Sequence, residues 1–371
     1  MRILHLITRM DRGGSAVNTL ISATEQQRAG HTVTLACGPS VESDMSAAEA
    51  AKVDADMQLF KALGGRLITL PSILRSMGWH DWRAYREIHH LLKQGFDIIH
   101  THTSKAGALG RLAAMQTSTP IVHTPHGHIF HGYFGSLKTS VFITIERYLA
   151  KKSDALIALT QAERDDHLAL RIGRAEQWCI IPSGVDIEQI HHGVARLDAE
   201  KVWDAVCVGR LVPIKGVERL IAAWVVVCQK KSDAKLALVG DGEDRKALEM
   251  LVQRHHLENN VTFAGWADPL PYLASARCFS LLSHNEGMGR AVVEAFAAGL
   301  PCVVSDVCGL RELVDDSVGK VVDATHPEQV AEALLTPWPD AIHTQAWARA
   351  QHYSVSAMID GLEAVYQEVQ P

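Results

Sequence analysis

The sequence lacks the features that mark exported, membrane-spanning or disulfide-rich proteins. No apolar run approaches the roughly 18 residues that a membrane-spanning helix needs, and the apolar part of "MRILHLITRM" ends after a few residues. The seven cysteines stand in apolar contexts without C-x-x-C spacing, which predicts reduced core thiols and no disulfide. We therefore expect a cytoplasmic protein.

Several enzyme motifs are missing as well. No G-x-G-x-x-G occurs at the first glycine turn, and Arg245 stands where the third glycine of "VGDGEDR" would fall, which argues against a dinucleotide-dependent oxidoreductase. H-E-x-x-H is absent, and the D-x-D formed by Asp54 and Asp56 falls in an expected helix, so we interpret it as chance. We expect no metal ion and no cofactor.

The charge is divided unevenly along the chain. Up to Val185 there are 20 Lys and Arg against 16 Asp and Glu, and the remainder has 16 against 26, which gives the net charge of −6. Neither half has the concentrated basic patch of a nucleic-acid-binding protein, so nucleic acid is excluded as a partner. The asymmetry indicates different partners for the two halves.

Apolar strands alternate with amphipathic helices twice along the 371 residues. This pattern predicts an α/β fold of two Rossmann-like domains, each with a parallel sheet, facing one another across a ligand-binding cleft. The polar segment 182–201 has no sustained period and is interpreted as the linker. The expected domains are 1–183 and 184–344, followed by a terminal segment 345–371 that forms one helix over about 345–369.

Two glutamates eight positions apart lie in "SHNEGMGRAVVEAFAAG". If a helix begins near Met288, its first N–H groups lack partners and form a site suited to an anion. Eight helical residues rise about 12 Å, so Glu286 and Glu294 can bracket an extended ligand with phosphate between them. The alternative is a solvent-facing Glu294 and a Glu286 that only favours the helix dipole.

Two further segments follow predicted strands with residues suited to phosphate. Arg210 and Lys215 in "VGRLVPIKG" bring two cations to a helix N-terminus, which suits a diphosphate. The alternative is that they are two surface charges on a loop. Gly13 and Gly14 in "DRGGSA" permit close approach of a phosphate to the backbone, or simply make a tight turn.

Histidines cluster at 100, 102, 123, 126, 128 and 131. We interpret them as a polar lining of the cleft rather than a metal site, with His126, after a proline at a strand end, best placed. The segment "GHIFHGYFGSLKTSVFITIERYLAKK" interleaves aromatic and basic residues, which is typical of a helix at a membrane interface or of an ordinary helix packed on the sheet.

Taken together, these motifs resemble those of the retaining glycosyltransferases of family 4, which have the GT-B fold. "EGMGRAVVEAFAAGLPCVVSD" is similar to the family's E-x7-E element, "VGRLVPIKG" to its diphosphate clamp, and "LALVGDGEDRKAL" and "IPSGVD" to its flanking motifs. The motifs arrive in the family's order over nearly the whole chain.

The resemblance implies a role for each candidate residue. Glu286 would hold hydroxyls of the transferred sugar and Glu294 the ribose hydroxyls, while His126 would lie beside the donor sugar. The remaining roles are the backbone cradle of the diphosphate (Gly287, Met288, Gly289), stabilisation of the leaving diphosphate (Arg210, Lys215), the first glycine loop (Gly13, Gly14) and a grip on the base (Trp266). Ala16 replaces a frequent family glutamate and Met288 a usual aromatic.

The implied activity is metal-independent, retaining transfer of a hexose or N-acetylhexosamine from a nucleotide-diphosphate donor, expected to be a UDP-sugar. The implied acceptor is a polyprenyl-linked or other cell-envelope glycan, as in lipopolysaccharide and polysaccharide biosynthesis, reached by peripheral association with the inner face of the membrane. Alternatives are a nucleotide-sugar epimerase or phosphorylase on the same plan, or a non-catalytic sugar-nucleotide-binding subunit.

Overall fold

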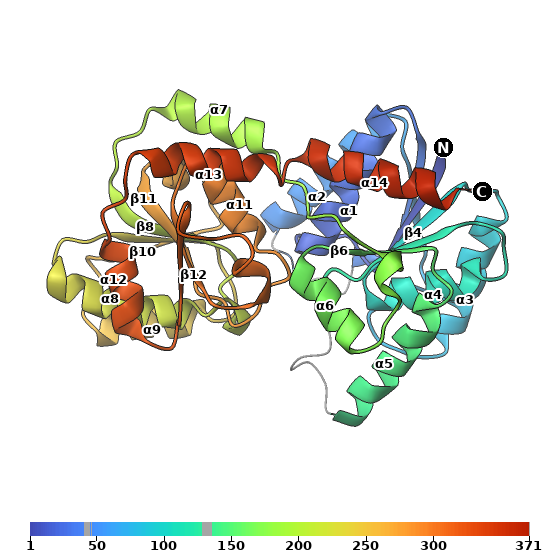
Figure 1. Cartoon of the computed structure of the whole chain (residues 1–371), viewed down its shortest axis with the longest axis horizontal. Helices are drawn as coiled ribbons and strands as arrows, with labels where there is room; N and C mark the ends of the chain where they lie inside the picture. The colour runs from blue at the N-terminus through green and yellow to red at the C-terminus, as the bar shows by residue number, and fades with distance from the viewer. Residues whose placement is uncertain (41–44, 46, 128–135, 371) are drawn as a thin grey trace. The chain divides into compact units, whose positions relative to one another are not determined.

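The computed structural model describes residues 1–40, 45, 47–127 and 136–370. By its internal contacts the chain divides into two units (Figure 1). Unit 1 consists of Met1–Gly184 with Val355–Pro371, and unit 2 is Val185–Ser354. The first unit is therefore assembled from two separate stretches of the chain.

Unit 1 is built on a seven-stranded parallel sheet with the strand order β3-β2-β1-β4-β5-β6-β7. The strands are β1 Arg2–Ile7, β2 Thr32–Cys37, β3 Arg66–Thr69, β4 Ile98–His102, β5 Ile121–Thr124, β6 Ala155–Ala158 and β7 Trp178–Ile180. The helices are α1 Gly14–Arg28, α2 Ala47–Ala62, α3 His80–Leu92, α4 Ser104–Ala114, α5 Ser136–Ala150, α6 Gln161–Ala169, the short η2 Ala175–Gln177 and α14 Val355–Val369.

Strand β1 shows why this sheet is buried on both faces. Successive side chains of a strand point to opposite faces. Ile3 and Ile7 join one apolar cluster, which includes residues of α1 and α14. Leu4 and Leu6 join another, with residues of α3 and α4. A strand covered by helices on both sides must be apolar at nearly every position, and this is the run that the sequence shows.

Unit 2 contains a six-stranded parallel sheet with the order β10-β9-β8-β11-β12-β13. The strands are β8 Trp203–Val208, β9 Leu236–Val239, β10 Val261–Gly265, β11 Ala276–Leu281, β12 Cys302–Ser305 and β13 Gly319–Val322. The helices are α7 Ile187–Leu197, η3 Pro213–Lys215, α8 Val217–Lys230, α9 Arg245–Arg254, α10 Leu270–Ala274, α11 Arg290–Ala297, η4 Cys308–Leu310, α12 Pro327–Leu335 and α13 Ala341–Gln351.

The prediction that segment 182–201 is a linker without regular structure is wrong, because most of the segment forms helix α7. Asp186 caps this helix by accepting a hydrogen bond from the backbone N–H of Gln189 at 3.1 Å. Ile187, Ile190, Val194 and Leu197 recur at spacings of three and four, so the helix is amphipathic, although only Ile187 is buried. The helix packs against α10 and α11 of unit 2.

The prediction of a single terminal helix over about 345–369 is also wrong. It is two helices, α13 and α14, with a break at 352–354. At the break, the N–H of Val185 donates to the carbonyl of Tyr353 at 2.9 Å. The chain passes between the units twice, next to these two residues, so the two connecting segments are hydrogen-bonded to each other. Helix α13 belongs to unit 2, whereas α14 packs on α1 in unit 1 (Figure 1).

All seven cysteines are free thiols, and Cys37, Cys207, Cys278 and Cys302 are buried as predicted, whereas the other three are partly exposed. Burial raises the pKa of Cys37 to about 11 and that of Cys207 to about 12, which keeps both thiols protonated and unreactive. In the described part of the chain, no helix is long and apolar enough to cross a membrane.

Candidate functional site

The strand order of unit 2 determines where its ligand site lies. Strands β8 and β11 are neighbours, although β9 and β10 lie between them in sequence, so the chain reverses its winding direction at this pair. Loops that leave the carboxyl ends of such a pair run to opposite sides and open a crevice for ligands. The loops in question are 209–216, after β8, and 282–289, after β11.

An ion pair joins these two loops. The ammonium of Lys215 donates to Oε1 of Glu286, and the Ser283 hydroxyl donates to the same oxygen at 2.8 Å. The side chains of Lys215 and Glu286 are 24% and 11% exposed, so both remain reachable from solvent. His284 Nε2 of the second loop also pairs with the carboxylate of Glu218, at the start of α8, at 2.9 Å. Lys215 of the predicted clamp and the first predicted glutamate therefore form one group.

Glycines hold both loops in conformations that other residues resist. Gly216 has φ +60°, and a Cβ there would lie 2.2 Å from the carbonyl oxygen of Leu282. Gly289 has φ +75°, and a Cβ would lie 2.4 Å from a methyl carbon of Leu310. Only glycine accepts both the positive φ and the close neighbour. The two loops are therefore closely packed, and each is restricted to one backbone conformation.

Helix α11 begins at Arg290, two residues later than predicted, because Gly289 is its N-cap in the left-handed conformation. Its N-terminus, the positive end of the helix dipole, follows the turn 286–289, which is an arrangement suited to an anion. Glu294 lies one turn into the helix and is partly buried. Met288 is almost fully buried, so the methionine found at the usual aromatic position is a packing residue.

The remaining predicted residues of this unit are exposed at the same end of the sheet. Arg210 follows β8, and its guanidinium forms no ion pair with any residue in the described ranges. Trp266 follows β10 and is 47% exposed. Both are available to a ligand at the carboxyl ends of the strands.

In unit 1 the glycine pair begins α1, but its first amide is already engaged. Gly13 is the N-cap, and its N–H donates to Oδ1 of Asp11 at 2.7 Å, while Arg9 pairs with Oδ2 at 2.6 Å. A carboxylate of the chain itself therefore lies where a phosphate was expected. Gly14 is exposed, and Ala16 is fully buried, with no space for the glutamate side chain that the family often has.

His126 adopts a strained backbone conformation just after β5. Its φ is +62°, which is uncommon for a residue with a Cβ. The next residue, Gly127, donates its N–H to Oε1 of the buried Glu163 at 2.7 Å, and Oε2 of this carboxylate accepts from the N–H of Leu159 at 2.7 Å. Burial lowers the pKa of His126 to about 3, so the ring is neutral at physiological pH.

The prediction that the other histidines line a cleft is wrong for His100, His102 and His123. All three are buried in β4 and β5, with at most 2% of their surface exposed. The reason is that these strands are covered on both faces, where an imidazole is tolerated only if both of its nitrogens find partners. His128 and His131 lie outside the described residues.

Sequence reasoning missed Ser283 and Glu163, which hold Glu286 and the His126 turn. Serine before a polar loop carries no specific signal. The signal for Glu163 was present in "TQAE", since Thr160 accepts a hydrogen bond from the Glu163 N–H at 3.1 Å as a helix N-cap.

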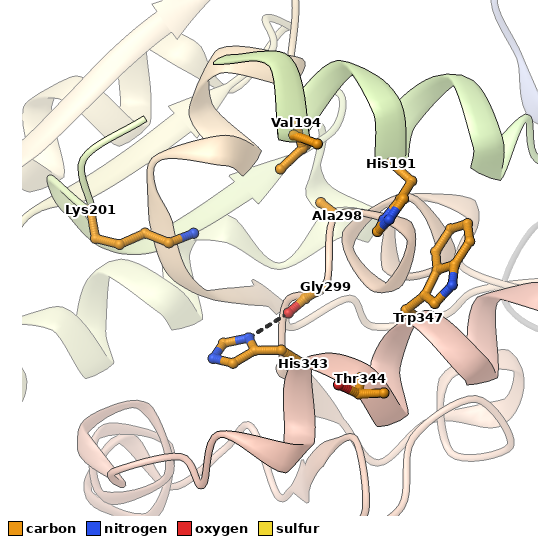
Figure 2. Close-up of a pocket in the computed structure, with 9 residues that line it drawn as sticks. His191, Val194, Lys201, Ala298, Gly299, His343, Thr344 and Trp347 are labelled. Atoms are coloured by element: carbon orange, nitrogen blue, oxygen red, sulfur yellow. Dashed lines mark hydrogen bonds between the residues drawn. The ribbon is translucent and has the colours of Figure 1, made fainter. Parts of the chain in front are cut away.

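A hollow of about 420 Å³ in unit 2 contains none of the predicted residues. Figure 2 shows it between α7, α11 and α13, with His191 stacked on Trp347 at 4.0 Å between ring centroids. Its surface is mostly apolar, and its hydrogen bond from His343 Nδ1 to the Gly299 carbonyl is internal to the protein. Lys201 is the one lysine or arginine among its lining residues, and its ammonium donates to the carbonyl of Ala274 at 2.9 Å, so the hollow has no pair of cations for a nucleoside diphosphate.

Comparison with known proteins places both units in one family. Residues 13–184 match the glycosyl transferase 4-like domain, and residues 194–350 match the glycosyl transferases group 1. The phosphatidyl-myo-inositol mannosyltransferase of Mycobacterium tuberculosis is 30% identical over 284 residues, which cover 73% of this chain and 71% of that protein. The UDP-Gal:alpha-D-GlcNAc-diphosphoundecaprenol alpha-1,3-galactosyltransferase of Escherichia coli is 29% identical over 293 residues, covering 75% and 76%.

Solved structures share the fold over the full length. The Anabaena protein Alr3699/HepE in complex with UDP superimposes with a TM-score of 0.81 at 22% identity, covering 99% of this chain and 100% of that one. The sucrose-phosphate synthase of Thermosynechococcus elongatus gives 0.78 at 20% identity, covering 99% and 98%. Together with the paired parallel sheets and the two family matches, these likenesses establish that the chain belongs to the group 1, family-4-like glycosyltransferases and has the GT-B fold.

Proposed function

We propose that this glycosyltransferase moves a sugar from a UDP-sugar to a lipid-linked glycan of the cell envelope, with retention of anomeric configuration and without a metal ion. The observation that carries the proposal is the Lys215–Glu286 pair at the N-terminus of α11. It joins a cation for the diphosphate and a carboxylate for sugar hydroxyls at one point. The Escherichia coli relative uses UDP-galactose, and the Anabaena structure holds UDP, which supports the choice of nucleotide.

The chemistry follows from where charge develops. As the bond from the anomeric carbon to the diphosphate breaks, positive charge grows on the sugar and negative charge on the leaving oxygen. Lys215, Arg210 and the N-terminus of α11 are the groups that would stabilise this oxygen. An ammonium has three donors, so Lys215 can keep its contact with Glu286 while it binds phosphate. Because these protein cations supply the positive charge, the proposed reaction needs no divalent ion.

Retention is proposed from the family resemblance and from Glu286. The carboxylate is held by Ser283 and Lys215, so it is oriented to accept hydrogen bonds from the sugar hydroxyls. In the proposed reaction the leaving phosphate takes the proton of the acceptor hydroxyl on the same face of the sugar. Glu294 would bind the ribose, and Trp266 would contact the base.

Helix α5 supports a membrane-facing acceptor. Val141, Ile145 and Tyr148 are exposed at spacings of four and three residues, so they form one apolar stripe, and Lys151 and Lys152 follow the helix. An apolar stripe beside lysines suits the surface of an anionic bilayer. Phe130, Tyr133 and Phe134, which the sequence also placed in this surface, lie outside the described residues.

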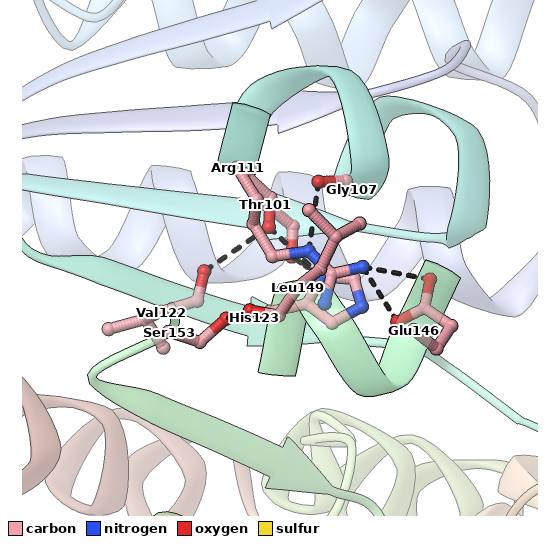
Figure 3. Close-up of polar contacts among 8 residues, drawn as sticks. All are labelled: Thr101, Gly107, Arg111, Val122, His123, Glu146, Leu149 and Ser153. Atoms are coloured by element: carbon pink, nitrogen blue, oxygen red, sulfur yellow. Dashed lines mark hydrogen bonds and ion pairs between the residues drawn. The ribbon is translucent and has the colours of Figure 1, made fainter. Parts of the chain in front are cut away.

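A buried ion pair fixes the orientation of α5. Arg111 of α4, which has no exposed surface, donates from Nη2 to both oxygens of Glu146 at 2.8 and 2.7 Å (Figure 3). Its Nε donates to the carbonyl of Gly107 at 3.0 Å. Glu146 thus turns one side of α5 toward α4, while the apolar stripe stays exposed.

A second exposed apolar group lies at the start of α3. Met77, Trp79 and Trp82 are 72%, 96% and 63% exposed, and Arg83 and Arg86 are exposed beside them. Tryptophan concentrates at membrane–water interfaces because its ring is apolar and its N–H is polar. This group supports the same partner, an anionic lipid surface.

The activity is tested by incubating the purified protein with UDP-, GDP- and ADP-sugars in excess EDTA, with and without a membrane lipid extract. We expect release of UDP that depends on the extract, persists in EDTA and disappears in Glu286→Ala. NMR of the product should show the anomeric configuration of the donor. Donor consumption without an acceptor would favour the epimerase, and failure to bind any nucleotide sugar would favour a non-catalytic role.

Membrane association is tested by co-sedimentation with vesicles of phosphatidylcholine, with and without phosphatidylglycerol. We expect binding only to the anionic vesicles, and weaker binding for Trp79→Ser with Trp82→Ser and for Val141→Ser with Tyr148→Ser. Met250→Ser, which removes an equally exposed apolar side chain from unit 2, is the matched control. Equal binding to both kinds of vesicle, or no loss in the variants, contradicts the proposed surface.

A further inference from the structure

A continuous chain of hydrogen bonds crosses the interior of unit 1 and ends at His126. Gln26 Oε1 lies 2.7 Å from His5 Nε2, and His5 Nδ1 lies 2.9 Å from His102 Nε2. His102 Nδ1 then lies 2.9 Å from His126 Nε2. Gln26, His5 and His102 are each at most 1% exposed. Three imidazoles and one amide therefore form a single polar line through an apolar core.

The fold dictates this arrangement. Strands β1 and β4 are parallel neighbours, with His5 in register with His100. Because strand side chains repeat every second residue, His102 lies on the same face as His100, one repeat nearer the carboxyl end. That face is covered by α1, which supplies Gln26, and the next strand, β5, leads into His126.

The chain has a direction. Burial lowers the pKa values of His5, His102 and His126, so all three rings are neutral and each has one N–H and one lone pair. In the amide orientation of the structure the Gln26 oxygen faces His5 and can only accept, so with this orientation His5 Nε2 carries the proton and His5 Nδ1 accepts. His102 Nε2 must then donate, and His102 Nδ1 accepts in turn. Each tautomer is determined by the one before it.

At the end of this line, His126 Nε2 must donate and Nδ1 is left with its lone pair. Nδ1 is buried and has no hydrogen-bond partner among the described residues. An acceptor buried without a partner costs free energy, and so does the positive φ of His126. Both features are explained if Nδ1 is the functional end of the line, completed by a ligand that donates a hydrogen bond.

We propose that Gln26, His5 and His102 are positioning residues that hold His126 in its Nε2–H tautomer, with Nδ1 as an acceptor for a hydroxyl of the donor sugar. This inference rests on the proposed function for the sugar, but the tautomer itself does not. A sugar hydroxyl is a suitable partner, because it can donate to Nδ1 without carrying charge into a buried site.

A metal site is the competing interpretation of the same residues. Nitrogens of His5, His100 and His102 lie within 4.8 Å of one another, close enough for a shared ion. The hydrogen bonds argue against it, since one proton lies between His5 Nδ1 and His102 Nε2. His100 is also engaged at both nitrogens, by the Tyr366 hydroxyl at 2.6 Å and by Thr124 Oγ1 at 2.7 Å.

The tautomer is tested on the free enzyme by NMR of protein labelled with [15N]histidine, with His126 assigned from the signal lost in His126→Gln. We expect a protonated Nε2 and an unprotonated Nδ1. In Gln26→Met and His102→Phe we expect a mixture of tautomers and a kcat that falls about 10- to 100-fold, as for other partners that orient a functional histidine. Gln26→Glu keeps an oxygen acceptor and should restore the single tautomer.

Thr124→Val is the matched control, because it removes a buried hydrogen bond of the same core without interrupting the line. It should change neither the His126 signal nor kcat. A protonated Nδ1 in the wild type, an unchanged tautomer in Gln26→Met, or a stoichiometric metal ion found by mass spectrometry overturns the proposal. If the tautomer is as expected but no sugar is transferred, the proposed function fails and the positioning network stands.

Discussion

Lys215 and Glu286 are 71 residues apart in sequence and meet only because β8 and β11 are adjacent. At the scale of single residues, this contact is the one on which the proposed chemistry depends. Lys215 has two functions in the proposal, to stabilise the leaving diphosphate and to orient the carboxylate that holds the sugar. Its removal should therefore affect the transition state more than substrate binding.

We predict that Lys215→Met lowers kcat/KM by about 10²- to 10³-fold, the usual effect of losing one preorganised donor to a developing anion. The measurement is steady-state release of nucleoside diphosphate. Lys246→Met, which removes an exposed lysine from α9, is the control and should leave the rate unchanged. A loss of less than threefold in Lys215→Met would exclude the lysine from the leaving-group site.

We predict that Gly289→Ala destabilises unit 2 more than Gly299→Ala does. Both glycines have a positive φ, +75° and +72°, which costs an L-residue about 1–2 kcal/mol. Only at Gly289 does the new methyl also press on Leu310, since the nearest atom at Gly299 is 3.7 Å away. Urea unfolding of the two variants measures the difference. Equal losses would mean that the loop relaxes freely around the methyl group.

At the scale of elements, the ion pair that holds α5 gives a further prediction. Removing one partner of a buried pair leaves an uncompensated charge, so Glu146→Gln or Arg111→Met should lower the stability of unit 1 by about 3–5 kcal/mol. The double variant Arg111→Met with Glu146→Leu should lose far less. Denaturant unfolding, followed for each unit, measures these losses of stability. A double variant as unstable as the single variants would contradict the prediction.

The positions of most elements could be predicted because apolar strands here are bounded by glycine, proline and polar turns. Helix α7 was missed although its apolar residues recur at helical spacing, because the short helix lies within a polar, glycine-bearing segment that favours a linker. The break between α13 and α14 was missed because it depends on the hydrogen bond from Val185, which no local pattern reveals.

The candidate site was predictable in its parts but not in its contacts. Arg210, Lys215 and Glu286 could be named because they follow strands and precede helices. That Lys215 binds Glu286 depends on the strand order of the sheet, which an isolated motif does not contain. The histidine line was likewise invisible, since Gln26 and His5 belong to no motif and join His102 only through the register of β1 and β4.

At the scale of the whole molecule, the buried histidines predict how stability depends on pH. Burial lowers the pKa of His5 from 6.5 to about 4, so the folded state favours the neutral ring. Between these values the unfolded chain binds the proton and the folded chain does not, so stability is full above about pH 6.5 and falls as the pH is lowered. One pKa unit corresponds to about 1.4 kcal/mol. The titration of His5 alone therefore lowers the free energy of unfolding by about 3 kcal/mol as the pH falls from about 6.5 to about 4.

We therefore expect unit 1, which contains His5, His100, His102, His123 and His126, to lose stability steeply between neutral pH and about pH 5. Urea unfolding at both values measures the loss, with a His5→Gln variant expected to show a shallower dependence. A unit 1 transition whose midpoint is the same at both values would mean that these rings titrate normally in the folded state.

The assembly of unit 1 from two stretches of chain also determines when it can form. Tyr366, Leu362 and Met358 of α14 belong to the same apolar cluster as Ile3 and Val33. On the ribosome, the sheet of unit 1 emerges first, but its last helix is synthesised only after all of unit 2. The nascent chain must keep one face of its first domain uncovered until unit 2 has been synthesised, so chaperones have their longest opportunity to bind at the surface that α14 later covers.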